Sequence, residues 1–140
     1  MFGSERRITL SIPIFDPGQD SRINILKVPA HHTYTVENAE IVVDRAINAS
    51  TANYVEFNLE NAGTSGTAQS AISDTIGGTA AVGTAPAWAA QTPKSLTIVA
   101  GSGDLAAGEY LALNYSETGT IGNQVITVLL DLVDGVGANA

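Results

Sequence analysis

The sequence predicts an all-β fold, a single-domain β-sandwich of about eight strands with one long loop. Short stretches in which apolar and polar residues alternate recur along the chain, as they do in half-buried strands. No segment keeps a helical period over three turns. A chain of 140 residues without cysteine suits one domain that buries its core without disulfides.

The first two strands are marked by alternation and by turn residues. Residues 6–14 carry isoleucine or leucine at every second position, and the triplet Asp16-Pro17-Gly18 then predicts a turn. Residues 21–28 predict the second strand, which ends at Pro29 because proline lacks a backbone donor.

Two further alternating runs follow, as one long strand or a broken pair. Residues 33–36 place Tyr34 and Val36 on one face, and residues 39–43 place the odd-numbered positions on one face. Residues 53–60 show the cleanest alternation, with Val55, Phe57 and Leu59 inward.

Three strands are expected near the C-terminus, at residues 95–99, 109–115 and 124–133. The last has apolar residues on both faces, which predicts a central position in its sheet. The domain boundaries that follow are an N-terminal arm over 1–7, the sandwich over 8–134 and a tail over 135–140.

The segment 61–92 is rich in Gly, Ala, Thr and Ser and is expected to be a long loop or insertion. One interpretation is an ordered surface loop with a short strand or helix near 69–76, and the other is a disordered linker. The spacing of its few large apolar residues favours the ordered loop.

Trp88, the only tryptophan, has two possible roles. It is either an anchor that holds this loop to the sandwich or a contact residue at a subunit or ligand interface. The anchor is favoured, because small residues offer little else to hold the loop. Trp88 remains a candidate interface residue together with Phe2, Arg6 and Arg7, which the predicted arm would bring to acidic groups of a partner.

The charge distribution limits the possible partners. Residues 1–45 hold five basic and six acidic groups, whereas residues 46–140 hold one basic and eight acidic groups. Nucleic acid is therefore not an expected partner, because phosphate binding needs clustered Lys and Arg. The apolar runs are far too short for a membrane span, so a membrane is not expected either.

Motifs that carry chemistry are scarce, and no cofactor, metal site or enzymatic activity is expected. The adjacent His31 and His32 point to opposite faces of an extended chain, so a structural or surface role is favoured over a metal site. Asp16 and Asp20 flank a turn without the dense oxygen series of a calcium loop. There is no Gly-x-Ser-x-Gly sequence, which is the usual signature of a hydrolase nucleophile.

Residues 95–132 carry a resemblance to a known family. The strand Leu96-Thr97-Ile98, the stretch from Leu105-Ala106-Ala107-Gly108-Glu109 to Leu113, and the closing strand 124–132 resemble small β-sandwich proteins of tailed-phage virions. The opening strand 7–14 and the step Val28-Pro29-Ala30 also fit that layout. The whole chain is similar in organisation to capsid decoration (cement) proteins, and it departs from them most at 61–92.

This resemblance implies a jelly-roll sandwich on the surface of a phage capsid, bound to the major capsid protein and stabilising the particle. It also implies a homo-oligomer, and a trimer would match the threefold points of a capsid lattice. The alternative is a virion fibre or tail domain, or a cell-surface carbohydrate-binding module. That alternative expects exposed aromatic side chains, for which the candidates are Tyr34, Tyr54, Trp88 and Tyr110.

Overall fold

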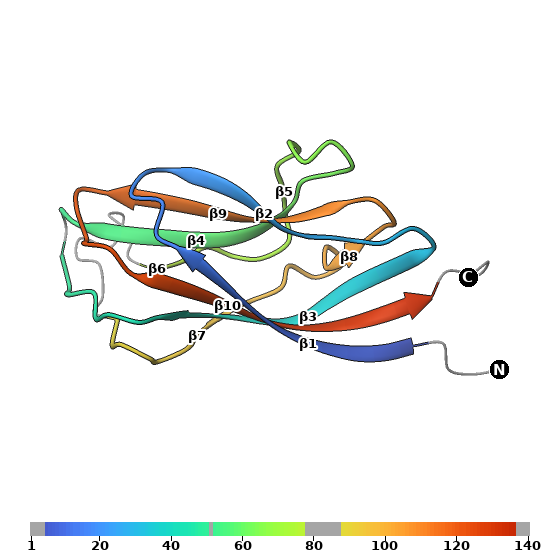
Figure 1. Ribbon diagram of the computed structural model, residues 1–140, viewed down its shortest axis with the longest axis horizontal. Coiled ribbons are helices and arrows are strands. Elements are labelled where there is room, and N and C mark those ends of the chain that lie inside the picture. The colour runs from blue at the N-terminus through green and yellow to red at the C-terminus, as the bar shows by residue number, and fades with distance from the viewer. Residues whose placement is uncertain (1–4, 51, 78–87, 137–140) are drawn as a thin grey trace.

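Two antiparallel sheets face each other in the computed structural model, with the core between them (Figure 1). The structure describes residues 5–50, 52–77 and 88–136, which contain ten strands and no helix. The all-β sandwich predicted from the sequence is thereby confirmed. The first described residue, Glu5, pairs with Gly135, so the described chain begins and ends at the same end of the sandwich (Figure 1).

Each sheet has three long strands and two short ones. Sheet A contains β1 (Glu5–Phe15), β10 (Val125–Val136), β3 (His32–Val43), β7 (Lys94–Leu96) and β8 (Asp104–Leu105). Sheet B contains β2 (Ser21–Lys27), β9 (Tyr110–Thr118), β4 (Tyr54–Asn61), β5 (Ser70–Ala71) and β6 (Ile76–Gly77).

The strand pairing is that of one long hairpin rolled up into two layers. Strand β1 pairs with β10, and β2 with β9. Strand β3 pairs with β7 and β8, and β4 with β5 and β6. Successive pairs belong alternately to sheet A and sheet B, which is the arrangement of a jelly roll. The predicted jelly-roll type is therefore also confirmed.

The core is built from the inner rows of the long strands. Ile126, Val128, Leu130 and Leu132 on β10 are 0–1% exposed, as are Val55, Phe57 and Leu59 on β4 and Leu111, Leu113 and Tyr115 on β9. Val55, Phe57 and Leu59 are the residues that the alternation of residues 53–60 placed inward. At the centre the Phe57 ring meets the rings of Trp88 and Tyr115 edge to face, with centroids 5.7 Å and 5.4 Å away.

A β-bulge explains the broken alternation of residues 33–43. The structure has a single strand there, in which Val36 lies opposite Leu132 and Asn38 lies opposite Asp131, so Glu37 is an extra residue. One extra residue reverses which positions face the core. The inner face therefore carries Val36 before the bulge and Ala39, Ile41 and Val43 after it.

The N-terminal strand begins earlier than the sequence predicts. Its pairing with β10 starts at Glu5, opposite Gly135, so residues 5–7 belong to the sandwich and not to an arm. Pairing with β1 carries β10 to Gly135 and pairing with β3 carries it to Val136, past the predicted boundary of the C-terminal tail. The remainder of both predicted segments, residues 1–4 and 137–140, lies outside the described residues.

The first half of the predicted long loop is ordered. Residues 62–77 carry β5 and β6, as expected for a loop with a short strand near 69–76. Arg22 holds the segment to sheet B, because its guanidinium pairs with Glu60 at 2.8 Å and also donates to the carbonyl oxygens of Thr67 and Ala68. Residues 78–87 lie outside the described residues.

The turn after β1 follows the predicted chemistry, and a turn before β9 uses a glycine and a carboxylate in a similar way. The Asp16 carboxylate accepts a hydrogen bond from the Gly18 amide at 2.7 Å, and Gly18 has a φ of 69°. Before β9, Gly108 has a φ of 81°, and the Glu109 carboxylate accepts a hydrogen bond from the Ala106 amide. Glycine suits both positions, because a positive φ is costly for residues with a Cβ.

Candidate interaction surface

Arg6 and Arg7, predicted to meet acidic groups of a partner, meet acidic groups of this chain. A guanidinium nitrogen of Arg6 lies 3.2 Å from the Asp134 carboxylate, and one of Arg7 lies 2.8 Å from the Glu37 carboxylate. Both side chains stay mostly exposed, at 68% and 76%, so the structure adds these ion pairs within the chain and the predicted contact of both residues with a partner stays a prediction. The physical reason for the ion pairs is that β1 continues to Glu5, which brings both arginines beside β10 and β3.

Asp134 joins the ends of three strands. Its carboxylate is 1% exposed and accepts hydrogen bonds from Arg6 of β1 and from His32 of β3, whose Nδ1 lies 2.8 Å away. Burial alone raises the pKa of Asp134, but the hydrogen bonds and charges of His32 and Arg6 outweigh it and hold that pKa below its ordinary value. The cluster thus fastens the end of the sandwich where β1 and β3 begin and β10 ends.

Trp88 is a core residue, as the anchor alternative predicts. Its side chain is 2% exposed, and its indole N–H donates to the Thr92 carbonyl oxygen at 2.8 Å. Its backbone forms a two-hydrogen-bond bridge with Ile47. A side chain this deeply buried supports the anchor over the interface role, and its assignment as an interface residue stays an untested prediction.

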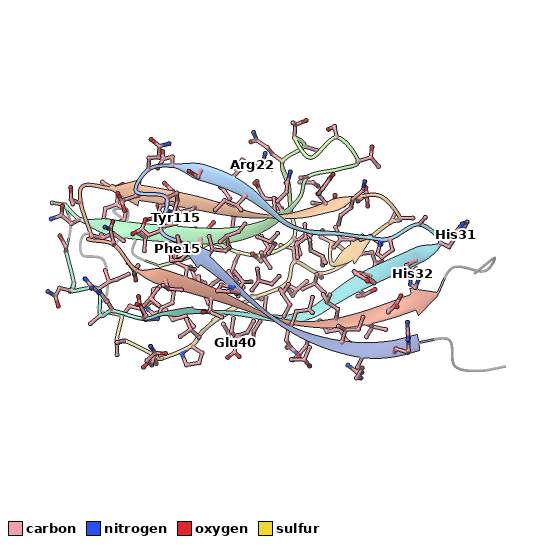
Figure 2. The ribbon with its side chains drawn as sticks, in the orientation of Figure 1. Phe15, Arg22, His31, His32, Glu40 and Tyr115 are labelled. Carbon is pink, nitrogen blue, oxygen red and sulfur yellow. The ribbon has the colours of Figure 1, made fainter. Side chains whose placement is uncertain are left out.

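The other predicted candidates occupy a loop end or lie outside the described residues. His31 is exposed in the turn between β2 and β3 (Figure 2), with a φ of 67°, while His32 belongs to the Asp134 cluster. Phe2, the fourth predicted interface residue, lies outside the described residues. No group of three or more potential metal ligands occurs among the residues that the structure describes.

The Asp16 turn also meets the core at Tyr115. The Tyr115 hydroxyl lies 3.0 Å from an Asp16 oxygen and 2.7 Å from a Glu117 oxygen. Burial first, and then these two acceptors, raise the pKa of the Tyr115 phenol above its ordinary range. The phenol is thus a neutral donor that ties the turn after β1 to β9.

The outer face of sheet A is the most distinctive surface of the described chain. Residues opposite one another in the β1–β10–β3 ladder share a face, so the register maps this surface in rows. From one end to the other, the rows are Phe15–Val125, Pro13–Thr127–Val42, Ser11–Leu129–Glu40, Thr9–Asp131–Asn38 and Arg7–Val133–Thr35.

One half of this face is apolar and almost uncharged. We call Pro13, Phe15, Val42, Val125 and Leu129 the apolar patch. Phe15 lies at the end of β1 (Figure 2) and is 84% exposed, the largest exposure of a large apolar side chain in the described chain; Val99 follows at 42%. Such a group of apolar side chains on an outer face is typical of an interaction surface.

The other half of the face is acidic. Glu40, which Figure 2 shows on the side of sheet A away from sheet B, borders the apolar patch, and Asp131 lies in the next row. Around the bulge these two residues line a groove of about 260 Å³ together with Thr9, Asn38 and Leu129. The surface therefore offers apolar contact area beside two carboxylates.

Reasoning from the sequence did not identify this surface. The available signal was the second apolar face of residues 124–133, which predicted a central strand, and β10 is indeed central between β1 and β3. However, Val125, Leu129 and Val133 on that face look away from sheet B and are only half-buried. Phe15 continued the outward parity of β1 and was not singled out.

Comparison of the sequence with protein-family models and with curated proteins finds no match in either. No helix of the described residues has the length and apolar character needed to cross a membrane.

Proposed function

We propose that this chain is a capsid decoration (cement) protein that binds the outer surface of a phage capsid through the outer face of sheet A. The observation that carries the proposal is the apolar patch around Phe15 on an otherwise polar sandwich. In an antiparallel sandwich the outward face is normally polar. Apolar residues on β1, β3 and β10 together indicate that this face is covered in the working state.

The mechanism of stabilisation is mechanical. The sandwich is held at both ends, by the Asp134 cluster and by the Tyr115–Asp16 contact, so it acts as a stiff body. A lattice that carries many copies multiplies modest single contacts, which makes a small patch sufficient. The major capsid protein is the proposed partner, and the virion is the proposed location.

The alternative, a fibre, tail or carbohydrate-binding module, depends on exposed aromatic side chains. Trp88 and Tyr54 are buried, at 2% and 8% exposure. Tyr34 and Tyr110 are partly exposed but lie on different sheets, so these two do not form one sugar-binding platform. The strongly exposed aromatic ring, Phe15, belongs to the apolar patch beside aliphatic residues, which supports decoration over carbohydrate binding.

Mass spectrometry of purified phage particles from the source of this sequence tests the proposal. We expect the chain among the virion proteins, in copy numbers comparable with the major capsid protein. Finding it only in infected-cell lysate, and never on purified particles, would contradict the proposed function.

We further propose a homotrimer as the unit on the particle, because closed symmetry is the usual form of such assemblies and three copies match a threefold lattice point. Light scattering at micromolar concentration, or the mass of the capsid-bound unit, should give three copies. A monomer both in solution and on the particle would reject the trimer while leaving decoration intact.

A further inference from the structure

The groove at the β3 bulge has a defined shape and a defined charge. It begins at Asn38, the residue after the extra Glu37, and bulges often lie next to functional surfaces because they re-aim side chains. Leu129 supplies an apolar wall, and the carboxylates of Glu40 and Asp131 stand beside it. The Thr9 hydroxyl donates to one Asp131 oxygen at 3.0 Å and thereby holds that carboxylate in place.

The groove lacks a counter-charge of its own. Among the described residues the Glu40 side chain has no hydrogen-bond or ion-pair partner, and the Asp131 carboxylate has only the neutral Thr9 hydroxyl. The sole cation mapped to the face, Arg7, is already paired with Glu37. A ligand that fits must therefore combine a positive head with an apolar stem, as lysine and arginine side chains do.

A second copy of this chain is poorly equipped to supply that cation. The chain has six Lys and Arg residues. Three are ion-paired, Arg6 with Asp134, Arg7 with Glu37 and Arg22 with Glu60. The ammonium groups of Lys27 and Lys94 lie over the rings of Tyr110 and Trp88, at 5.3 Å and 5.2 Å from the centroids. Only Arg45 remains, so charge complementarity favours a different protein.

We propose that this groove receives a lysine or arginine side chain from the capsid surface on which the protein docks, with the apolar patch closing around it. The inference rests on the proposed function and adds the chemistry of the partner: a basic side chain that projects from apolar surroundings. The apolar patch supplies contact area, and the groove fixes the orientation of the sandwich on the lattice.

The test measures how tightly wild type and a double variant bind to stripped capsids, which are capsids of the source phage from which this protein has been removed. The variant Glu40→Gln with Asp131→Asn keeps the size of both side chains and the Thr9 contact but removes both charges. We expect this double variant to bind about tenfold more weakly than wild type at low salt. Wild-type affinity should fall between about 50 and 500 mM salt, and that of the double variant should fall much less.

The matched control is Glu56→Gln, which removes one carboxylate from the outer face of sheet B. It should bind capsids as wild type does, and all variants should keep the wild-type circular dichroism spectrum and melting temperature. A double variant that binds with unchanged affinity and unchanged salt dependence would overturn the groove proposal and leave the proposed function standing.

Two other outcomes are also decisive. No binding of wild type to stripped capsids would contradict both the groove proposal and the proposed function. A double variant that binds capsids normally but loses oligomeric mass in solution would show that the groove contacts a second copy, and that would overturn the capsid side chain as its occupant.

Discussion

Trp88 and Asp134 hold together segments that lie far apart in the sequence. Trp88 joins its own segment to Ile47 by backbone hydrogen bonds and to Phe57 by ring contact. Asp134 joins β10 to Arg6 and His32. The sequence predicted the first role, because a lone indole among small residues needs an apolar site and a hydrogen-bond acceptor. It did not predict the second, because nothing local shows which strands Asp134 will face.

The change Trp88→Ala tests the anchor. Loss of a buried indole removes apolar contacts and leaves a cavity beside Phe57, so we expect the free energy of unfolding to fall by about 3–5 kcal/mol. Trp88→Phe keeps a ring and should cost clearly less. In wild type, the emission of the single tryptophan should be blue-shifted in the isolated protomer. Emission typical of a solvated indole would contradict the anchor.

The stability supplied by Asp134 should depend on pH in a defined direction. Its pKa is lowered from the ordinary 3.8. The stabilisation is therefore complete above that ordinary value and is lost as the pH falls through the lowered pKa of the folded state. At neutral pH, Asp134→Asn should cost about 2 kcal/mol, because a buried charge-assisted hydrogen-bond pair is weakened.

Denaturant unfolding of wild type and Asp134→Asn across the acid range measures this effect. The difference in unfolding free energy between the two proteins should be constant around neutral pH. It should become smaller as the pH drops below the ordinary pKa of an aspartate. A gap that stays constant to the most acidic condition at which both proteins fold would show that ionisation of Asp134 does not stabilise the fold.

At the scale of elements, the pattern of alternation identified the long strands and the faces they bury. It also signalled the bulge, since Tyr34 and Val36 are even-numbered while the inner positions after them are odd-numbered. A bulge within one strand and a break between two strands produce the same change of parity. The sequence therefore left both alternatives open, one long strand or a broken pair. The alternation could not predict the bounds of the two-residue strands β5, β6 and β8, because two residues carry no periodicity.

Deletion of Glu37 tests the bulge. Without the extra residue, one part of β3 must turn its inner side chains outward, so we expect a loss of stability above about 3 kcal/mol, or failure to fold. Glu37→Ala is the matched control, because it removes only the exposed ion pair with Arg7 and should cost less than about 1 kcal/mol. Chemical denaturation compares the two. If the deletion lowers the unfolding free energy no more than Glu37→Ala does, the β3–β10 register with Glu37 as an extra residue is wrong.

At the scale of the whole molecule, the sequence predicted the two-layer architecture but not the pairing that builds it. Alternation shows that a strand buries one face, whereas the partner of each strand depends on contacts between distant segments. The pairing of β1 with β10 shows why this matters, because it extends both strands beyond their predicted ends. It also creates the outer face of sheet A, which no single strand reveals.

That outer face is the link between fold and function. The apolar residues on both faces of β10 predicted that both faces are buried. In the structure only the inner face is buried, against sheet B, and the outer face is half-buried. A capsid surface that packs on Phe15, Val125 and Leu129 would cover the other side. Under the proposed function these outer apolar residues would serve docking, since the core cluster of the sandwich does not include them.

The most direct measurement is the temperature at which stripped capsids break, followed by DNA release with and without the added protein. The account predicts that wild type raises this temperature, and that Phe15→Ser with Leu129→Ser, which removes exposed and half-buried apolar contacts, raises it much less while remaining folded. Capsids that break at the same temperature with and without saturating wild-type protein would contradict the role of cement.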